Sequence, residues 1–488
     1  MMGPSLPVCG AWAFLNMQAT SESPSSPVAG IILAAGKGTR MKSDLPKGLH
    51  QVCGLPMVEH IGRAMKASGV TRPIVVIGHG ADAMRGALGE TYDFTLQKEQ
   101  LGTGHATLTT AALLKDYSGP VIVAAGDTPM LEAETFQALL KAHRDSKAAI
   151  TLATCVVENP FGYGRIVRDD KGVFSRIVEQ KDAKPEQLKI CEVNAALYCF
   201  DAKTLFRVLP TIKNTNSQGE YYLTDVLEAV VQQGGKVLAQ IFEDRTLLVG
   251  VNDRWQLANV DLEMRRRIVK RHAMNGVTFH DIDSVSIGVD VEIGIDTVIE
   301  PQTILTGKTK IGSKCHIGPF SRLLDCTMGD ESSFVASYAE RATIGNKVWV
   351  GPYAHLRPHA QLSNGVKIGN YVEIKNSQLS PGAKVNHLSY VGDSTVGANT
   401  NIGAGTITCN YDGIDKHRTT IGANAFVGSN STLVAPITIG DDAMIAAGSV
   451  VTGDVPSEAM AFGRARQENK DGRATQWRNN KKSSKPQS

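Results

Sequence analysis

The stretch IGVDVEIGIDTVIEPQTILTGKTKIGSKCHIGPFSRL, residues 287–323, places an apolar residue at every sixth position. Helices repeat about every 3.6 residues and strands every second residue, so neither gives this period. A six-residue repeat is typical of a parallel β-helix, in which each apolar side chain stacks on its counterparts in neighbouring coils. We therefore predict a β-helix over residues 276–456. Two later stretches keep the period, and the three series are Ile287, Ile293, Ile299, Leu305, Ile311, Ile317 and Leu323; Ile344, Val350, Leu356, Leu362, Ile368 and Ile374; and Ile421, Val427, Leu433, Ile439, Ile445 and Val451.

The repeat is interrupted twice, between residues 324 and 343 and over GAGTITCNYDGIDKHRTT, residues 403–420. An insertion in a solenoid maps to a loop on one face, which is often the binding face. The interruptions therefore indicate where this scaffold carries a site.

Residues 28–252 follow a different pattern. Apolar runs typical of buried parallel strands alternate with segments of helical spacing, which predicts a doubly wound, Rossmann-like α/β sheet with ligands at the carboxyl ends of its strands. Residues 253–275 contain neither Gly nor Pro and are expected to form a linker helix, which ends before Gly276. The expected strands are VAGIILAA (28–35), PIVVIGH (73–79) and PVIVAAGD (120–127), and the expected helices are MVEHIGRAMKASG (57–69) and LEAETFQALLKAHR (131–144).

Composition narrows the function. The chain has 488 residues, 42% of them hydrophobic, and a formal net charge of +3, which does not suit a basic nucleic-acid-binding body. Its eight cysteines include no CxxC pair, and no apolar run reaches the roughly 20 residues of a membrane span. We expect a cytoplasmic protein with no membrane span and no nucleic-acid partner. Residues 1–27 read as a disordered leader and residues 457–488 as a polar, basic, disordered C-terminal tail.

A glycine-rich turn follows the first strand as LAAGKGTRM (33–41), and LPK (45–47) comes soon after it. Backbone N–H groups in such a turn can approach phosphate, and Arg40 and Lys47 can neutralise a triphosphate. The spacing fits neither the Walker motif nor the dinucleotide GxGxxG motif. Asp127 follows the strand at 120–125, where it could hold Mg²⁺ or could simply cap the next helix.

Together these motifs resemble a known family. LAAGKGTRM with LPK is similar to the sugar-1-phosphate nucleotidyltransferase signature. The further motifs narrow the resemblance, over about residues 28–468, to the bifunctional bacterial family of N-acetylglucosamine-1-phosphate uridyltransferase and glucosamine-1-phosphate acetyltransferase. They are QKEQLGTGHA (97–106), FGYGRI (161–166), IVEQKDA (177–183), EVNAALY (192–198), QGEYYLTD (218–225) and GVND (250–253).

The resemblance implies roles in the front half. Arg40 and Lys47 stabilise charge on the triphosphate, and Asp127 and Asn252 hold Mg²⁺. The nucleotide site is implied to comprise Leu33, Ala34, Ala35, Gly36, Ala125 and Gly126, with Gln97, Gly102 and Thr103 reading uracil and Gly164, Glu179 and Asn194 holding the sugar. The attacking phosphate is already anionic, so positioning and charge neutralisation suffice without a general base.

In the back half, a β-helix could be catalytic or purely structural. The segment that favours a catalytic one is KVNHLSYVGDSTVGANTNIGAGTITCNY (384–411). An amine must lose a proton when it attacks a thioester, and imidazole suits that task near neutral pH. By resemblance, His387 is this base, the β-helix is left-handed, and the protein is a homotrimer that uses acetyl-CoA and UTP. The implied contacts are Arg357, Lys375, Tyr390 and Asn401 for glucosamine-1-phosphate, and Ala404, Asn410, Tyr411, Ser429, Ala447 and Arg464 for acetyl-CoA.

Three positions depart from the family pattern: Gly48 after Lys47, Thr128 after Asp127, and His355 before the LRP motif. None removes a charged group from the implied sites, and we expect activity to persist. The leading interpretation is an enzyme that acetylates glucosamine-1-phosphate and then uridylylates the product to UDP-N-acetylglucosamine, a cell-envelope precursor. A monofunctional sugar-1-phosphate nucleotidyltransferase with a structural β-helix is the first alternative, and a non-catalytic regulatory subunit is the second.

Overall fold

The computed structural model of the chain describes residues 27–483. The predicted leader, residues 1–27, therefore lies outside the described residues apart from Pro27. The chain divides into two compact units. The first contains residues up to His50 together with Met57–Asn252, and the second contains Gln51–Pro56 together with the residues from Asp253 onward.

The first unit is built on a sheet with the strand order β11-β7-β10-β6-β1-β4-β5. Neighbouring strands are parallel, except that β10 runs antiparallel to β6 and β7. An antiparallel pair, β8 and β9, extends from β10. The three predicted strands are confirmed as β1, β4 and β6. The bounds are β1 Ala29–Leu33, β4 Ile74–Ile77, β5 Asp93–Leu96, β6 Pro120–Ala125, β7 Ile150–Val156, β8 Arg165–Arg168, β9 Phe174–Val178, β10 Glu192–Asp201 and β11 Val237–Ile241.

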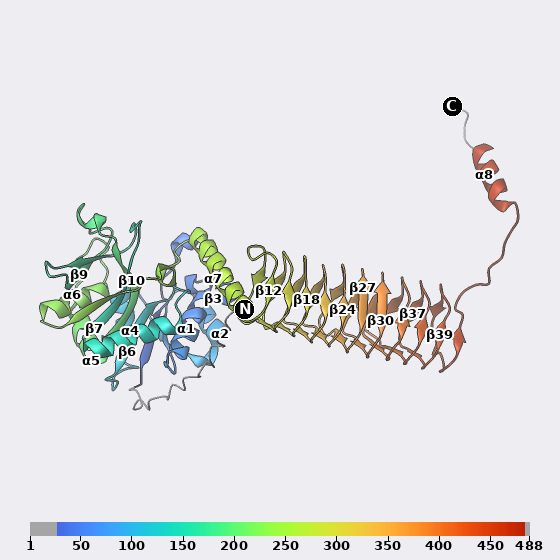
Figure 1. Cartoon of the computed structure of the whole chain (residues 1–488), viewed down its shortest axis with the longest axis horizontal. Coiled ribbons are helices and arrows are strands. Elements are labelled where there is room, and N and C mark those ends of the chain that lie inside the picture. The colour runs from blue at the N-terminus through green and yellow to red at the C-terminus, as the bar shows by residue number, and fades with distance from the viewer. Residues whose placement is uncertain (1–26, 484–488) are drawn as a thin grey trace, which may run out of the picture. The chain divides into compact units, whose positions relative to one another are not determined.

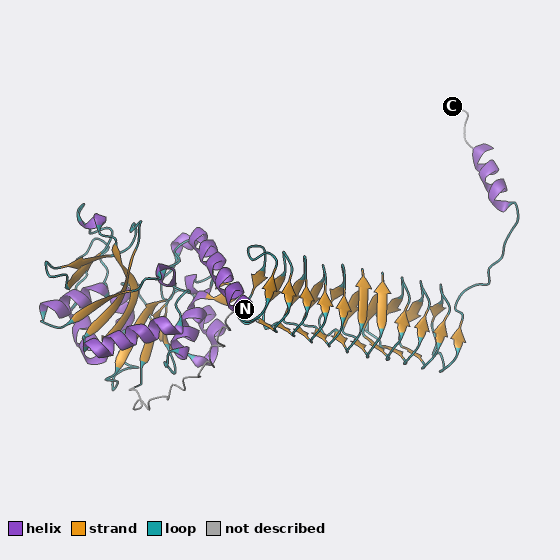
Figure 2. Cartoon of the chain, in the orientation of Figure 1, coloured by secondary structure: helices purple, strands orange, loops and turns teal. Residues whose placement is uncertain are grey.

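Helices cover both faces of this sheet (Figure 2). Side chains alternate along a strand, so Ile31 joins the core that contains Leu205 of α5, whereas Ile32 joins the core that contains Ile61 of α1. Because helices bury both faces of the sheet, a ligand-binding site is expected at the carboxyl ends of the parallel strands. The helices are α1 Met57–Ala67, α2 Ala81–Leu88, α3 Thr103–Leu108, α4 Ala133–Ser146, α5 Ala202–Val208 and α6 Thr224–Gln232, and α1 and α4 confirm the two predicted helices.

The second unit begins with the predicted linker helix, α7 (Arg254–Met274). The Asp253 side chain caps it by accepting a hydrogen bond from the Gln256 N–H at 2.8 Å. The hairpin of β2 (Gln51–Val52) and β3 (Leu55–Pro56) belongs to the same unit. Its turn residue Cys53 donates its N–H to the Asp261 carboxylate on α7 at 2.8 Å.

The strands between Thr278 and Ala461 form a left-handed parallel β-helix, whose stacked coils are visible in Figure 1. Three parallel sheets of 11, 10 and 9 strands form its faces. Registry follows the predicted repeat: Ile287 pairs with Leu305 and Leu305 pairs with Leu323, and all three are fully buried. The strands near the candidate site are β25 His355–Leu356, β27 Lys367–Asn370, β28 Glu373–Lys375, β30 Lys384–His387, β31 Tyr390–Gly392, β33 Asn401–Ile402 and β34 Ile407–Cys409.

The two interruptions differ in kind. Between 324 and 343 no loop is inserted, because buried Met328, Phe334 and Ala339 continue the stack with some steps shortened to five residues. The expectation of a loop there is wrong. In the second interruption the pairing step lengthens from Lys384↔Asn401 to Asn401↔Phe426, so the chain does carry a loop after β34.

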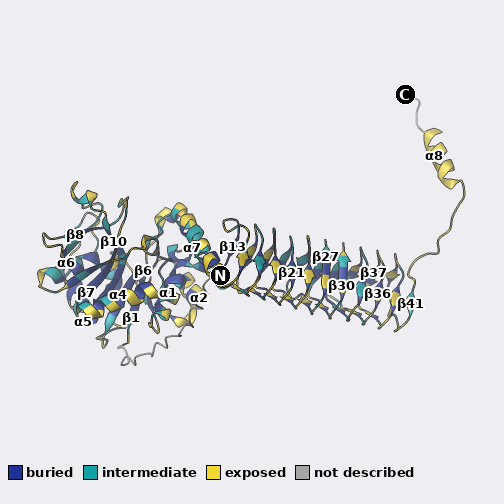
Figure 3. Ribbon diagram, viewed as in Figure 1, coloured by how far each residue is buried: buried dark blue, intermediate teal, exposed yellow. Residues whose placement is uncertain are grey.

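The C-terminal segment is more ordered than its composition predicted. Strand β41 (Met460–Ala461) pairs with β39 (Met444–Ile445), so the β-helix continues past residue 456. Residues 473–483 form α8 rather than a disordered tail, since Ala, Gln, Arg and Lys all favour helix. This helix buries none of its residues (Figure 3). None of the helices in residues 27–483 combines the length and hydropathy of a membrane span.

Candidate active sites

The first unit has a cavity of about 320 Å³ at the carboxyl ends of β1 and β6. The glycine-rich turn after β1 lines this cavity. Two backbone hydrogen bonds of 2.9 Å hold the turns in place: Ala34 donates its N–H to Val76 on β4, and Gly126 donates its N–H to Leu33 on β1. A Cβ on Gly126 would lie 2.8 Å from the Leu33 carbonyl oxygen, so only glycine lets the two turns meet. The cavity brings together eleven of the predicted residues: Leu33, Ala34, Ala35, Gly36, Lys47, Gln97, Gly102, Thr103, Ala125, Gly126 and Asp127.

The residues implied for charge and metal also meet. Lys47, on the 3₁₀ turn Lys47–Leu49, pairs its ammonium with the Asp127 carboxylate and donates to the Asn252 Oδ1 at 3.1 Å. Arg40 donates to the same Asn252 oxygen at 2.8 Å. The Val251 N–H bonds to the Asp127 carbonyl at 2.8 Å, which brings the segment carrying Asn252 to this edge of the sheet.

These contacts fit a divalent cation. The Asp127 and Asn252 oxygens already converge on one ammonium nitrogen, so a single cation can reach both. A carboxylate and an amide oxygen are hard ligands of the type that Mg²⁺ prefers. Among the described residues no group of three or more His, Cys, Asp or Glu side chains could hold a metal. A metal here would therefore complete its shell with water and substrate phosphate oxygens.

Gln97, Gly102 and Thr103 form one rim of the cavity. The buried Gln97 side chain donates to the Gly102 carbonyl at 3.1 Å, which fixes the orientation of its amide. Thr103 begins α3 and accepts the Leu223 N–H at 3.0 Å through its hydroxyl. The three residues thus form a braced polar edge rather than a loose loop.

The residues implied for the sugar, Gly164, Glu179 and Asn194, form a cluster of their own. A Cβ on Gly164 would lie 3.3 Å from both Glu179 carboxylate oxygens, and the Gly164 carbonyl accepts the Asn194 N–H at 2.9 Å. Burial raises the pKa of Glu179, and the charges of Asp225 and Asp182 raise it further. The cluster presents a carboxyl and an amide, both of which can hydrogen-bond to hydroxyl groups.

Seven residues that line the cavity were not among the predicted site residues: Gly48, Gln100, Ala106, Ala196, Tyr198, Glu220 and Leu223. Two of them, Ala196 and Tyr198, belong to an irregular part of β10. Strand β10 has a register shift between Asn194 and Tyr198, and Ala196 within it adopts a φ of 52°. Ala196 and Tyr198 line the cavity, and the Tyr198 hydroxyl accepts from the Asn194 amide at 2.7 Å. The motif EVNAALY carried no signal for a bulge, because its apolar alternation is that of an ordinary strand.

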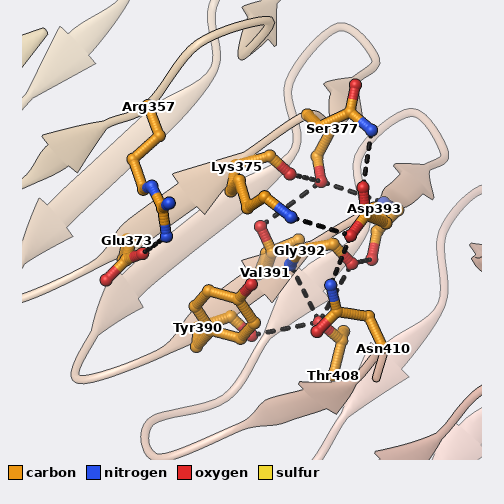
Figure 4. Close-up of polar contacts among 12 residues, drawn as sticks. Arg357, Glu373, Lys375, Ser377, Tyr390, Val391, Gly392, Asp393, Thr408 and Asn410 are labelled. Atoms are coloured by element: carbon orange, nitrogen blue, oxygen red, sulfur yellow. Dashed lines mark hydrogen bonds and ion pairs between the residues drawn. The ribbon is translucent and has the colours of Figure 1, made fainter. Parts of the chain in front are cut away.

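In the second unit, a polar network surrounds Asp393 (Figure 4). Lys375 pairs with this carboxylate at 3.2 Å, Asn376 donates to it at 2.5 Å, and the buried Asn410 side chain donates to it as well. Burial works to raise the pKa of Asp393, but the hydrogen bonds from Asn376, Asn410 and Lys375 outweigh it and lower the pKa. Sequence reasoning did not single out Asp393, which holds two predicted residues, Lys375 and Asn410, in place.

Arg357, Lys375 and Tyr390 come from successive coils of the same sheet, at or beside β25, β28 and β31. Arg357 and Lys375 occupy corresponding positions, whereas Tyr390 pairs with Glu373, two residues before Lys375. Arg357 pairs with the Glu373 carboxylate at 2.8 Å, another partner that the sequence reasoning missed. This face therefore presents two cations and a phenol, and groups of this kind can bind phosphate. Asn401 lies on the neighbouring sheet, on β33, and does not join this face.

His387 ends β30, and the corner after it leads to Tyr390 on the adjacent sheet. Its Nδ1 lies 2.9 Å from the Asn370 Oδ1. An amide oxygen only accepts, so Nδ1 carries the proton and the Nε2 lone pair is left to take one. The imidazole borders a cavity of about 490 Å³ together with Trp349, Lys367 and Asn370.

Four of the six residues implied for acetyl-CoA, Ala404, Ser429, Ala447 and Arg464, lie along the edge that carries His387, whereas Asn410 bonds to Asp393. The Gly405 N–H bonds to the His387 carbonyl at 3.4 Å, the Asn430 N–H to Ala404 at 2.7 Å and the Gly448 N–H to Ser429 at 2.8 Å. Ala404, Ser429 and Ala447 therefore occupy one corner of successive coils, and Arg464 lies next to Gly448. Tyr411 lies beyond this edge on the loop after β34, where it is exposed.

The three departures from the family pattern are accommodated. Gly48 is buried, but a Cβ there would make only ordinary contacts, the nearest at 3.4 Å to Met84. Thr128 is buried, and its hydroxyl donates a hydrogen bond to the Ala125 carbonyl at 2.9 Å. The His355 ring packs against the Tyr338 ring at an interplanar angle of 36°, with the ring centroids 5.1 Å apart.

Comparison with known proteins agrees with both halves. Residues 29–259 match the Nucleotidyl transferase family. Residues 341–376 match the Bacterial transferase hexapeptide (six repeats) family, and residues 418–453 match the Hexapeptide repeat of succinyl-transferase family. The fold and its two sites thus define a nucleotidyltransferase joined to a hexapeptide-repeat transferase.

Curated relatives identify the family. The Bifunctional protein GlmU of a Geobacillus species is 47% identical over 441 residues, 90% of this chain and 96% of that protein. The protein of the same name from Carboxydothermus hydrogenoformans is 49% identical over 91% of this chain and 99% of its own length. That of Streptococcus agalactiae is 47% identical over 91% of this chain and 97% of its own length. The chain belongs to the bifunctional GlmU family. It combines glucosamine-1-phosphate acetyltransferase and N-acetylglucosamine-1-phosphate uridyltransferase activities for UDP-N-acetylglucosamine synthesis.

Proposed function

We propose that each reaction has its own unit: residues 28–252 transfer UMP from UTP, and the β-helix, which begins after α7 and continues past residue 456, transfers acetyl from acetyl-CoA. One observation carries this assignment. Every residue proposed for uridylylation lies in the first unit, and every residue proposed for acetylation lies in the second. Residues 253–275 act as the connecting helix, and residues 457–488 as the C-terminal segment.

In the front site, the chain's contribution is positioning and charge. Gln97, Gly102 and Thr103 hold the uracil, while Glu179 and Asn194 orient the sugar whose phosphate attacks the α-phosphorus of UTP. Lys47 and Arg40 stabilise the charge that moves onto the leaving pyrophosphate. Mg²⁺, held by Asp127 and Asn252 when bound, supplies further neutralisation of the triphosphate.

In the back site, His387 removes the proton from the glucosamine amine as the nitrogen attacks the thioester carbonyl, and CoA leaves as its thiol. Asn370 holds the imidazole in the tautomer that has Nε2 free. Arg357, Lys375 and Tyr390 bind the sugar phosphate, and Asn401, on the neighbouring sheet, is left out of this set. The acetyl-CoA contacts are Ala404, Asn410, Tyr411, Ser429, Ala447 and Arg464.

We also propose a cytoplasmic homotrimer. Seven described cysteines are all free, as expected in a reducing compartment, and UTP and acetyl-CoA are available there. One corner of the β-helix exposes large apolar side chains on three successive coils, at Tyr353, Tyr371 and Leu388, and Ala336 separates these from Phe320 at the same corner. A contiguous apolar edge of this kind suits contact with further copies of the chain.

A coupled assay tests the proposal. Purified protein is given glucosamine-1-phosphate, acetyl-CoA, UTP and Mg²⁺, and free thiol and pyrophosphate are followed separately. We expect thiol release without UTP, and pyrophosphate release only after acetylated sugar has formed. Pyrophosphate without thiol would support the monofunctional alternative, and neither product would support the regulatory one.

A further inference from the structure

Arg165 is a buried cation that the two reactions leave unexplained. It begins β8 and is 1% exposed. Within residues 27–483 its guanidinium makes no ion pair: Nη2 donates to the Gln180 Oε1 at 2.7 Å, Nη1 donates to the Tyr163 carbonyl, and buried Nε has no partner. Burial lowers the pKa of Arg165. The charge of the nearby Glu179 carboxylate opposes that shift, but the hydrogen bonds of the guanidinium go only to neutral acceptors. Burying a cation in this way costs stability, which suggests a positioning role.

All of its contacts fix one loop, residues 159–164. The Gln180 oxygen that accepts from Arg165 also accepts the Gly162 N–H at 2.9 Å, and Tyr163 is held through its carbonyl. Two successive loop residues are therefore tied to one Arg–Gln pair. Gln180 itself follows Glu179 directly in the chain.

The tied loop ends at Gly164, which touches the proposed sugar carboxylate. The space for a Cβ on Gly164 is bounded by the Glu179 oxygens at 3.3 Å, and the Gly164 carbonyl accepts from Asn194 at 2.9 Å. Arg165 and Gln180 thus flank Gly164 and Glu179 in sequence and bond across to each other. A displacement of the loop would move the sugar-facing groups together.

We propose that Arg165 and Gln180 form a clamp whose role is to position Gly164, Glu179 and Asn194 for the sugar of N-acetylglucosamine-1-phosphate. The inference rests on the proposed uridylyltransferase site. The clamp touches neither the nucleotide cavity nor the Lys47 and Asp127 cluster, so its loss acts on sugar binding and not on UTP binding. Both members are positioning residues, since neither is placed against the reacting atoms.

The test is Gln180→Ala, because Gln180 is only half-buried and its removal leaves the core intact. Hydrogen bonds to charged groups support an increase of about tenfold in KM for N-acetylglucosamine-1-phosphate. The kcat and the KM for UTP should stay within about twofold of the wild type. Gln180→Glu keeps an acceptor for Arg165 and should return the sugar KM to near the wild-type value.

The chain offers a matched control in Gln233→Ala. Arg207 donates to Gln233 at 2.6 Å in an exposed Arg–Gln pair far from either site in sequence, and its loss should change neither KM. An unchanged sugar KM in Gln180→Ala, an equal rise in the KM for UTP, or no rescue by Gln180→Glu would overturn the clamp. Absence of UDP-N-acetylglucosamine formation by the wild type would instead overturn the proposed function on which the clamp rests.

Discussion

Replacing His387 by alanine separates the two activities most cleanly. The side chain is exposed at the end of β30, so its removal leaves no buried cavity and the coils should stay folded. A positioned general base contributes about 10²- to 10⁴-fold to a rate. We expect kcat for acetylation of glucosamine-1-phosphate to fall by that factor.

The variant Asn370→Ala provides a comparison for the fall in acetylation rate expected of His387→Ala. The Asn370 side chain bonds to the imidazole Nδ1 at 2.9 Å, and such a bond contributes about 1 kcal/mol, or roughly a fivefold change in rate. Its removal lets the imidazole populate the wrong tautomer but leaves the base in place. The structure therefore predicts a small loss for Asn370→Ala and a large loss for His387→Ala.

The assay is release of free CoA thiol at saturating acetyl-CoA, with pyrophosphate release from N-acetylglucosamine-1-phosphate and UTP measured in parallel. Uridylylation should remain within about twofold of the wild type in both variants. If His387→Ala kept more than about a tenth of the acetylation rate, below the range for a general base, His387 would not be the base. Equal losses in the two variants would refute the tautomer argument.

Three further outcomes follow from the first unit. Asp127→Ala removes the carboxylate that faces Lys47, so we expect pyrophosphate release to fall by at least about 10²-fold with acetylation unchanged, as measured by the same two readouts. Ala196→Gly relieves a left-handed backbone conformation at φ 52°, and urea denaturation should show a gain of about 1 kcal/mol in the free energy of unfolding of this unit; a loss of stability would contradict it. Burial, with the charges of Glu228 and Asp182, raises the pKa of Asp225 to about 6, so the protonated form stabilises the fold at pH 4 and that contribution disappears as pH rises through 6. Relative to wild type, Asp225→Asn should therefore gain about 1 to 2 kcal/mol between pH 4 and pH 7, a value reduced because the group is half-exposed, and a pH-independent difference in denaturation midpoints would contradict it.

The β-helix was predictable because its signal is local and repeated. Each buried residue such as Leu305 or Leu323 stacks on the same position of the next coil, so spacing alone carries the fold. The steps of five residues near Met328 and Ala339 were not predicted. A shortened step breaks the six-residue period in the sequence, although the buried side chains still stack on the neighbouring coils. Helix α8 escaped because its polar composition is shared by disordered and exposed helical segments.

Site residues that belong to a family motif could be predicted from the sequence. Residues that act only through contacts with distant parts of the chain could not. Lys47, Asp127 and Asn252 lie far apart in the chain, and the family signature supplied them before the structure brought them together. Asp393 and Arg165 act through hydrogen bonds across strands, and no spacing in the sequence marks such partners. The bulge at Ala196 likewise depends on strand pairing, which the sequence does not specify.

The central claim is that two independent sites in one chain perform successive reactions. Mixing His387→Ala with Asp127→Ala tests it directly, because the acetylated sugar made by the second variant can be released and used by the first. With glucosamine-1-phosphate, acetyl-CoA, UTP and Mg²⁺, we predict UDP-N-acetylglucosamine from the mixture and none above background from either variant alone. Product from a single variant, or none from a mixture of two folded variants, would contradict the account.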